Sequence, residues 1–366
     1  MGLEFVVCST RSMRSYSALV VTELLKYKSF QPFAVEINAV NALSADRFAD
    51  GEMEVSLDRS VRGRIVILFA ACARNEAGIS VEEAKLELYY AVDVLSRSQA
   101  KKIIVFEPYV SSSRSDRTTR RNSVGLWVHL KTLVTLGVRH IVTYQLHSDK
   151  SKSMLDPTLC VLDDIPGFNL LAQYICDRYI KDMDILQNEV KKNWAFCSVD
   201  AGGENTARIF ANAFGAGLVI AHKQRDYSKV NTIESINILS AEPLENKKLW
   251  IIDDMIDTGA SVEVLVRALI KHKPAEINIV VVHAPLSAPA PKRISELCRC
   301  NLVNRLIVTD TVHISPNLLS EFCNLELVTS EELSAHIIRN IITGASMTGL
   351  RTRFNAAAYL ERRELF

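Results

Sequence analysis

The chain has 366 residues, 48% of them hydrophobic, and a formal net charge of +1 from 43 basic and 42 acidic residues. This is enough apolar material for two sizeable cores. Because the numbers of basic and acidic residues are almost equal, we expect neither a nucleic acid nor a membrane surface as a partner. The longest apolar run, residues 65–73, is too short to span a bilayer. Its 8 cysteines are scattered, several within apolar runs, which fits a reducing, cytoplasmic environment.

Strand-like and helix-like patterns alternate through the first half of the chain. Residues 1–8 indicate a first strand rather than a signal peptide. Further strands are predicted over 64–70, 102–106 and 140–146, and a helix over 80–97. Ser80 and Glu83 have the spacing of a capping box at the start of that helix. Its predicted buried face consists of Val81, Ala84, Leu88, Ala91, Val92 and Leu95.

The second half repeats this order. Strands are predicted over 217–221, 249–252 and 277–283, and a helix over 262–272. Such alternation is typical of α/β proteins with largely parallel sheets. We therefore expect two related domains, residues 1–162 and 163–350, each a mainly parallel sheet flanked by helices. Residues 351–366 form a charged tail, for which a solvated extension is favoured over a partner-binding helix.

The segment from Asp253 to Ser261 lies between a predicted buried strand and a predicted helix. Its small residues let backbone N–H groups converge on an anion at the helix N-terminus, where the helix dipole also favours negative charge. Aspartates would disfavour a site for phosphate alone, because carboxylates repel phosphate. The pattern therefore indicates a ligand with both a phosphate and vicinal hydroxyls, in which Asp253 and Asp254 accept from a sugar diol. An ordinary helix-capping turn is the simpler alternative.

This string closely resembles the phosphoribosyl-binding motif of phosphoribosyltransferases and of ribose-phosphate pyrophosphokinases, with Ala260 where glycine is common. The order of motifs over residues 3–350 resembles the second of these families along nearly the whole chain. The resemblance implies two phosphoribosyltransferase-like domains. It also implies that ribose 5-phosphate is bound by Arg225, Asp253, Asp254, Asp257, Thr258, Gly259, Ala260 and Ser261.

Two segments of the first half resemble the ATP-binding segments of the family. Residues 48–52, Phe-Ala-Asp-Gly-Glu, resemble its Phe-x-Asp-Gly-Glu segment, which in the family reaches an ATP bound to a neighbouring subunit. Residues 108–118 resemble its loop with Pro-Tyr followed by Arg-Gln-Asp-Arg-Lys, but Ser115 and Thr118 depart from that pattern, as do residues 111–113. The implied ATP-binding residues are Phe48, Asp50, Glu52, Arg114, Ser115, Asp116 and His147.

Two further segments imply Mg2+ as the cofactor. Leu146-His147 resembles the family's Asp-Leu-His, whose histidine contacts the magnesium–ATP unit, with Gln145 in place of the aspartate. Residues 198–203 resemble the family's Ser-Pro-Asp-Ala-Gly-Gly, in which Asp200 would hold the ion because hard cations prefer oxygen ligands. His147 and Asp200 are thus the implied metal ligands.

The last segment implies the catalytic residues. Lys223-Gln224-Arg225 resembles the family's Lys-Arg-Arg, so Lys223 and Arg225 carry the implied catalytic role, and residues 226–232 are expected to be mobile. The implied reaction transfers the β,γ-pyrophosphoryl group of ATP to the 1-hydroxyl of ribose 5-phosphate and releases AMP. The resemblance also implies a homo-oligomer, a hexamer or another dimer-based assembly, with active sites shared between subunits.

Three alternatives stay open from the sequence. The first is a non-catalytic regulatory paralogue, which the departures at Ser115, Thr118 and Gln145 motivate and the retained Lys223 and Arg225 oppose. The second is a phosphoribosyltransferase, which the duplicated domain fits poorly. The third is a synthetase with an altered acceptor, such as a larger derivative of ribose 5-phosphate.

Overall fold

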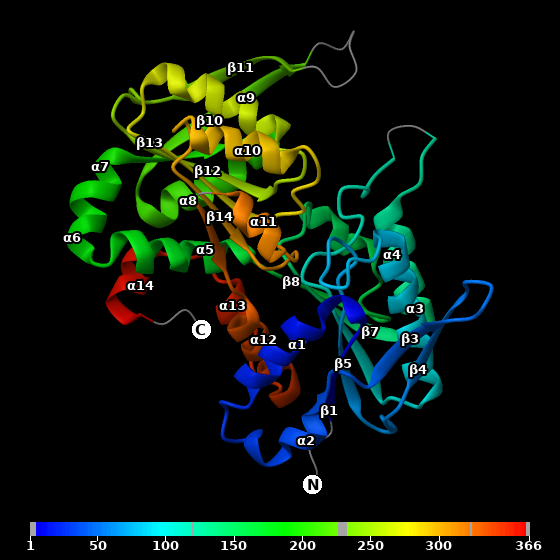
Figure 1. Ribbon diagram of the computed structural model, residues 1–366. Coiled ribbons are helices and arrows are strands. Elements are labelled where there is room, and N and C mark those ends of the chain that lie inside the picture. Colours follow the sequence, from blue (N-terminus) through cyan, green and yellow to red (C-terminus); the bar gives the residue numbers. More distant parts are fainter. Residues whose placement is uncertain (1–4, 119–120, 226–232, 323, 364–366) are drawn as a thin grey trace. The chain divides into compact units, whose positions relative to one another are not determined.

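The computed structural model describes residues 5–118, 121–225, 233–322 and 324–363 (Figure 1). The segment 226–232, for which we expect mobility, lies outside the described residues. The chain divides into two compact units. The first comprises Met1–Ile165, Thr311–His313 and Thr329–Met347, and the second comprises Pro166–Asp310, Ile314–Val328 and Thr348–Phe366.

The first unit is built on a six-stranded sheet in which every pairing is parallel. The strand order is β2-β1-β5-β6-β7-β8. The bounds are β1 Phe5–Ser9, β2 Asn38–Ala39, β5 Ile65–Phe69, β6 Lys102–Phe106, β7 Val138–Tyr144 and β8 Val161–Ile165. All residues of β1 are buried, as expected for a parallel strand that is covered on both faces. The strands predicted in the first half correspond to β1, β5, β6 and β7.

Two helices cover one face of this sheet. They are α3 (Val81–Arg97) and α4 (Gly125–Leu136), and their apolar residues share one core with those of β5 and β6. The antiparallel hairpin of β3 (Leu43–Arg47) and β4 (Met53–Leu57) lies beside α3. The helices α1 (Arg14–Leu24), α2 (Ala34–Ile37) and α12 (Glu331–Thr343) also belong to this unit.

Helix α3 confirms one hydrogen bond of the predicted capping box but not the whole predicted buried face. The hydroxyl of Ser80 accepts a hydrogen bond from the N–H of Glu83 at 3.2 Å. Val81 is 40% exposed, contrary to the prediction, because it is the first residue of the helix and less of the surrounding structure covers it. A charged residue, Glu87, is instead buried in that face.

The prediction that residues 163–350 form one domain is wrong for residues 329–347, which pack with the first unit. Helix α12 lies against α1. The hydroxyl of Tyr16 on α1 is 2.8 Å from the hydroxyl of Ser330 and 2.7 Å from that of Ser334, and Tyr144 at the end of β7 is 2.6 Å from Ser334. The apolar face of α12 predicts burial but does not specify which sheet it covers.

The second unit contains a seven-stranded sheet with the order β11-β10-β9-β12-β13-β14-β15. The bounds are β9 Trp194–Ser198, β10 Gly217–Arg225, β11 Ile233–Ser240, β12 Lys248–Met255, β13 Glu276–His283, β14 Arg305–Thr309 and β15 Leu325–Val328. Only the pairing of β10 with the edge strand β11 is antiparallel; the others are parallel. The strands predicted over 217–221, 249–252 and 277–283 correspond to β10, β12 and β13.

Helices cover both faces of this second sheet. One core contains residues of α9 (Ala260–Leu269), α10 (Ala290–Arg299) and α11 (Pro316–Glu321), and the other contains residues of α5 (Gly167–Ile175), α8 (Glu204–Phe214) and α14 (Ala356–Arg362). The short helices α6 (Met183–Ile185), α7 (Lys191–Asn193) and α13 (Thr348–Arg351) complete the unit. Together the two units confirm the predicted α/β class with mainly parallel sheets. No helix among the described residues is long and apolar enough to cross a membrane.

The prediction of a solvated tail is wrong for one face of α14, although most of residues 351–363 are exposed. The side chains of Ala356, Tyr359 and Leu360 are buried in the second unit, where they pack with residues of α5 and α8. The hydroxyl of Tyr359 donates to the carboxylate of Asp177 at 2.8 Å. Burying an aromatic side chain and a leucine stabilises a fold by roughly 1.5–3 kcal/mol each, which outweighs the solvation of the few charged residues around them.

Candidate functional site

The predicted sugar-phosphate turn joins β12 to α9 in the second unit. Asp253 and Asp254 occupy the end of β12, and Ala260 and Ser261 form the first turn of α9. Gly259 precedes the helix with φ +72°, a left-handed conformation that glycine adopts without strain. The turn therefore delivers its backbone to the N-terminus of a helix, where N–H groups and the helix dipole favour an anion.

A neighbouring strand and a helix contact this turn. The N–H of Ile256 donates to the carbonyl of His283 at the end of β13, at 2.9 Å. The guanidinium of Arg293 on α10 donates to the carbonyl of Thr258 at 3.1 Å. Asp257 and Thr258 thus lie in a turn that is anchored by β13 and by α10, which fixes the direction in which its amides point.

Carboxylates converge beside the turn. Burial raises the pKa of Asp253 well above its usual range, and the negative charges of Asp254 and Asp200 raise it further. Asp200 follows β9, the strand next to β12, and its side chain accepts hydrogen bonds from the N–H groups of Gly202 at 2.9 Å and Gly203 at 3.2 Å. A sugar diol or a cation would relieve the repulsion among these carboxylates.

The predicted catalytic residues Lys223 and Arg225 lie on β10, whose backbone pairs with β9 on one side and β11 on the other. Their side chains lie outside the described residues. The register of β10 against β11 is interrupted between Gln224 and Arg225. Since β10, β9 and β12 are adjacent and parallel, the segments that follow them meet at one edge of the sheet, where α/β proteins bind ligands.

The predicted ATP-binding residues Phe48, Asp50 and Glu52 form the tip of the β3–β4 hairpin in the first unit. The N–H of Phe48 donates to the carbonyl of Glu52 at 2.9 Å, and the N–H of Glu52 donates to the carboxylate of Asp50 at 3.0 Å. Phe48 is 54% exposed. The hairpin thus presents an aromatic ring and two carboxylates to its surroundings.

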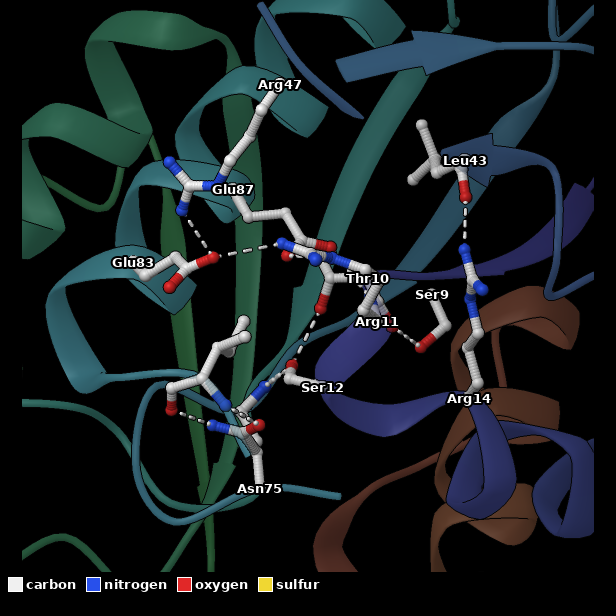
Figure 2. Close-up of polar contacts among 12 residues, drawn as sticks. Ser9, Thr10, Arg11, Ser12, Arg14, Leu43, Arg47, Asn75, Glu83 and Glu87 are labelled. Carbon is white, nitrogen blue, oxygen red and sulfur yellow. Dashed lines mark hydrogen bonds and ion pairs between the residues drawn. The ribbon is translucent and has the colours of Figure 1, made fainter. Parts of the chain in front are cut away.

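A chain of ion pairs braces this hairpin against α3 (Figure 2). Arg47 donates to the carbonyl of Gly51 at 2.6 Å and to the carboxylate of Glu83 at 2.7 Å. The guanidinium of Arg11 donates to the carboxylates of Glu83 at 3.4 Å and Glu87 at 3.0 Å. The backbone N–H of Arg11 also donates to the carboxylate of Glu87 at 2.7 Å. The hairpin tip is therefore tied, through Glu83, to the segment that follows β1.

Sequence reasoning missed this brace. Glu87 is 2% exposed and lies among the apolar residues of α3, so its partner had to come from elsewhere in the chain. A glutamate within a predicted buried helix face was a usable signal, because buried charges are paired. The sequence did not show that Arg11 is the partner.

The loop between β6 and α4 contains Arg114, Ser115 and Asp116. Arg114 is exposed, and Asp116 is partly buried. The hydroxyl of Ser115 accepts from the N–H of Gly125 at 2.9 Å and lies 3.3 Å from the carbonyl of Ser123. The predicted ATP contact of Ser115 therefore has to coexist with its role in joining this loop to the first residue of α4.

His147 follows β7, the strand next to β6, and is exposed. The residue before it, Leu146, donates its N–H to the carboxylate of Asp164 at 3.0 Å, and Lys152 lies 3.0 Å from the same carboxylate. The carboxyl ends of β6 and β7 thus bring the Arg114 loop and His147 to one edge of the first sheet. The structure groups the predicted ATP residues 114–116 and 147 in this way.

The donors present fit Mg2+ in their chemistry. In the part of the chain that the structure describes, no three His, Cys, Asp or Glu side chains are arranged to hold a metal ion. Mg2+ usually takes only one or two protein carboxylates and completes its shell with water and substrate phosphates. The carboxylates around Asp200 and Asp253 are hard oxygen donors of this kind. His147 belongs to the first unit and Asp200 to the second, so an ion shared by them stays a prediction.

Fold and turn together define an α/β protein with an acidic, glycine-containing turn at a helix N-terminus, and comparisons with known proteins identify its family. The model of the phosphoribosyl transferase domain matches residues 175–310, and that of the N-terminal domain of ribose phosphate pyrophosphokinase matches residues 6–137. Ribose-phosphate pyrophosphokinase from Mycoplasma genitalium is 30% identical over 268 residues, which cover 73% of this chain and 74% of that protein. The chain belongs to the ribose-phosphate pyrophosphokinase family.

Two further relatives extend the likeness over more of the chain. Ribose-phosphate pyrophosphokinase from Helicobacter pylori is 28% identical over 308 residues, 84% of this chain and 87% of that protein. The crystal structure of phosphoribosylpyrophosphate synthetase from Mycobacterium smegmatis is 25% identical, with a TM-score of 0.77, and covers 93% of this chain and 100% of that one. The predicted family and fold class are thereby confirmed.

Proposed function

We propose that this protein is a ribose-phosphate diphosphokinase, which forms 5-phosphoribosyl 1-diphosphate and AMP from ATP and ribose 5-phosphate. The observation that carries the proposal is the complete turn from Asp253 to Ser261, seated between a buried strand and a helix N-terminus beside Asp200. A diol and a phosphate on one small molecule satisfy both the carboxylates and the amides of this site. The relatives' names identify ribose phosphate and diphosphate transfer as the chemistry of the family.

Ribose 5-phosphate binding is assigned to the second unit. The amides of the turn and the hydroxyls of Thr258 and Ser261 would hold the phosphate. Asp253 and Asp254 would accept from the ribose hydroxyls, and hydrogen bonds to charged groups contribute about 1.5–3 kcal/mol each. Binding of this kind fixes the direction of the 1-hydroxyl, and positioning is a main source of rate in phosphoryl transfer because the transition state is loose.

ATP binding is assigned to the first unit. Arg114 offers a planar, charged fork to the phosphates, and Phe48 offers an exposed face to an adenine ring. Asp50, Glu52, Ser115, Asp116 and His147 are the remaining candidates. His147 in the first unit and Asp200 in the second are the candidate ligands of Mg2+, which would neutralise phosphate charge when bound.

Lys223 and Arg225 are proposed to stabilise the transferred group. In the reaction the 1-hydroxyl oxygen bonds to the β-phosphorus, the bond between that phosphorus and the α,β-bridging oxygen breaks, and the hydroxyl proton passes to solvent. Negative charge grows on the AMP oxygen and on the oxygens of the transferred group, so fixed cations lower the barrier. Loss of one such cation typically costs about 3 kcal/mol in the transition state.

The test is AMP formation from magnesium–ATP with and without ribose 5-phosphate, for the wild type, Lys223→Ala and the control Lys273→Ala. We expect AMP that depends on ribose 5-phosphate, a loss of about a hundredfold or more in kcat for Lys223→Ala, and little change for Lys273→Ala, whose side chain is exposed. Wild-type protein that binds ribose 5-phosphate but forms no AMP would contradict the proposal and favour a non-catalytic paralogue or an altered acceptor.

We also propose a homo-oligomer, in line with the family resemblance of residues 48–52. Light scattering at several protein concentrations checks this, because a monomer at all concentrations would contradict it.

A further inference from the structure

A buried polar chain lies beneath the loop that carries Arg114. Glu107, the residue after β6, is fully buried, and His129 on α4 is 1% exposed. His129 Nε2 lies 2.9 Å from Glu107 Oε2, and the hydroxyl of Tyr89 on α3 lies 2.9 Å from His129 Nδ1. The other carboxylate oxygen of Glu107 accepts from the N–H of Ser111 at 3.0 Å.

The directions of these hydrogen bonds follow from the groups themselves. A carboxylate only accepts, so His129 Nε2 and the Ser111 N–H donate to Glu107. In the neutral ring His129 Nδ1 then accepts from the Tyr89 hydroxyl. Burial and the neighbouring Glu107 charge raise the pKa of the Cys72 thiol well above its usual range, so this residue stays neutral beside the carboxylate. The carboxyl group of Glu107 thus joins the backbone of Ser111 to His129 and, through it, to Tyr89.

A second contact fixes the next residue of the loop. Lys85 lies one helical turn before Tyr89 on α3, its side chain is 14% exposed, and its ammonium donates to the hydroxyl of Ser112 at 3.1 Å. Ser112 has φ +63°, a left-handed conformation that is unusual for a residue other than glycine. Such strain persists only where the surroundings determine the conformation. The consecutive loop residues Ser111 and Ser112 are thus held by the side chains of Glu107 and of Lys85 on α3.

We propose that Glu107, His129, Tyr89 and Lys85 form a clamp of positioning residues that holds the loop of Arg114 in the shape that binds ATP phosphates. The proposal rests on the function proposed above. A buried charge with hydrogen-bonding partners is costly to keep and costly to break. At the base of a predicted nucleotide-binding loop, such a group makes the loop backbone rigid. A preorganised loop loses less entropy when it binds its ligand.

The clamp is tested with Glu107→Met, which removes the acceptor of the Ser111 N–H, and Glu107→Gln, which keeps a carbonyl oxygen for it. We expect Glu107→Met to raise the KM for ATP about tenfold or more, with a smaller change in kcat and none in the KM for ribose 5-phosphate. Glu107→Gln should restore most of the ATP affinity. Equilibrium binding of a non-hydrolysable ATP analogue gives the same comparison without turnover.

A matched control separates positioning from general stability. His140 and Asp163 form a second buried pair in the same sheet, at 2.8 Å, but His140 is aligned with Ile104 inside the sheet and not with the loop. Asp163→Met therefore removes a carboxylate from a buried histidine without touching residues 107–115. We expect a comparable loss of thermal stability and an unchanged ATP affinity.

Tyr89→Phe decides the matter if Glu107→Met does not fold. It removes one hydroxyl, and we expect about a fivefold loss of ATP affinity with the fold retained. Unchanged analogue binding in both Tyr89→Phe and the folded Glu107 variants would overturn the clamp and leave the proposed function intact. A wild type that binds the analogue but forms no AMP would overturn the function, while the binding series would still decide the clamp.

Discussion

The turn between β12 and α9 and the loop between β6 and α4 both serve a phosphate in the proposed reaction, yet they are held in different ways. The turn adopts its left-handed conformation at a glycine, Gly259, which takes φ +72° without strain. The loop places Ser112 at φ +63° and depends on Lys85 and Glu107 to keep it there. The backbone shape of the turn is thus set by a glycine within it, whereas that of the loop depends on side chains that are distant in the sequence.

This difference has a consequence for how each site changes. The turn takes its backbone shape from its own glycine, and contacts with His283 and Arg293 then hold it in place. A loop that is held from outside can exchange its own residues as long as its supports remain, and residues 111–113 and Ser115 do depart from the family pattern. The hydroxyl of Ser115 has a structural contact in this loop, because it joins the loop to the first residue of α4.

The largest effect is expected where the turn meets the sugar. Asp254→Ala removes a charged acceptor, so we expect the affinity for ribose 5-phosphate to fall about a hundredfold, equivalent to roughly 3 kcal/mol, while ATP affinity is unchanged. Calorimetric titration with each ligand measures this. Glu296→Ala, an exposed carboxylate on α10, is the control. An equal loss of ATP affinity would show that the two sites are not separately built.

The next largest effect is expected in the pH dependence of stability, through Asp253 in the turn. The pKa of Asp253 is raised in the folded protein by burial and by Asp254 and Asp200, so the folded state holds its proton more tightly than the unfolded state does. This contribution to the free energy of unfolding is fully present below the ordinary pKa of an aspartate. It is lost as the pH rises through the raised pKa of Asp253 in the folded protein. The slope is at most about 1.4 kcal/mol per pH unit for one group.

Urea unfolding of the ligand-free protein at several pH values measures this effect, with Asp253→Asn beside the wild type. The variant should show a flatter fall of the unfolding free energy above about pH 4, because its amide does not titrate. Parallel curves for the two proteins would mean that Asp253 titrates normally.

The glycine of the turn gives a matched test of smaller size. Gly259 and Gly63 share φ +72°, and a Cβ on Gly259 meets its nearest atoms at 3.6 Å, an ordinary contact. Alanine at either position should therefore cost the same backbone strain, about 1–2 kcal/mol. Thermal unfolding should show similar losses, but only Gly259→Ala should weaken ribose 5-phosphate binding. Loss of that binding in Gly63→Ala as well would mean that stability alone decides it.

The smallest effect is expected at the brace of the hairpin. Glu83→Gln weakens the pairs with Arg47 and Arg11, which are partly exposed, so we expect a change below about 1 kcal/mol in stability. Because the brace holds the hairpin tip, the KM for ATP should still rise about twofold to threefold. Arg97→Ala, which removes an exposed pair at the other end of α3, should leave that KM unchanged.

Much of the candidate site could be predicted because its signals are local. The turn from Asp253 to Ser261 shows strand, turn and helix start within one short stretch, and the structure has them in that order. The hydrogen bond between the Ser80 hydroxyl and the Glu83 N–H could likewise be predicted, since both residues belong to the same helix turn. The roles of Lys223, Arg225 and the ATP residues came from resemblance and stay predictions.

The sequence by itself determined the α/β class, the family and the strand–turn–helix order around residues 253–261, because periodicity, small residues and turn chemistry act between near neighbours. Only the tertiary structure decided that α12 joins the first unit, that Arg11 neutralises Glu87 and that residues 356–360 cover α5 and α8. The partners in these contacts are far apart, as Tyr89 and His129 are, 40 residues from each other. Apolar burial has no direction, so a helix face or a buried charge predicts that a partner exists, and the folded chain decides which one it is.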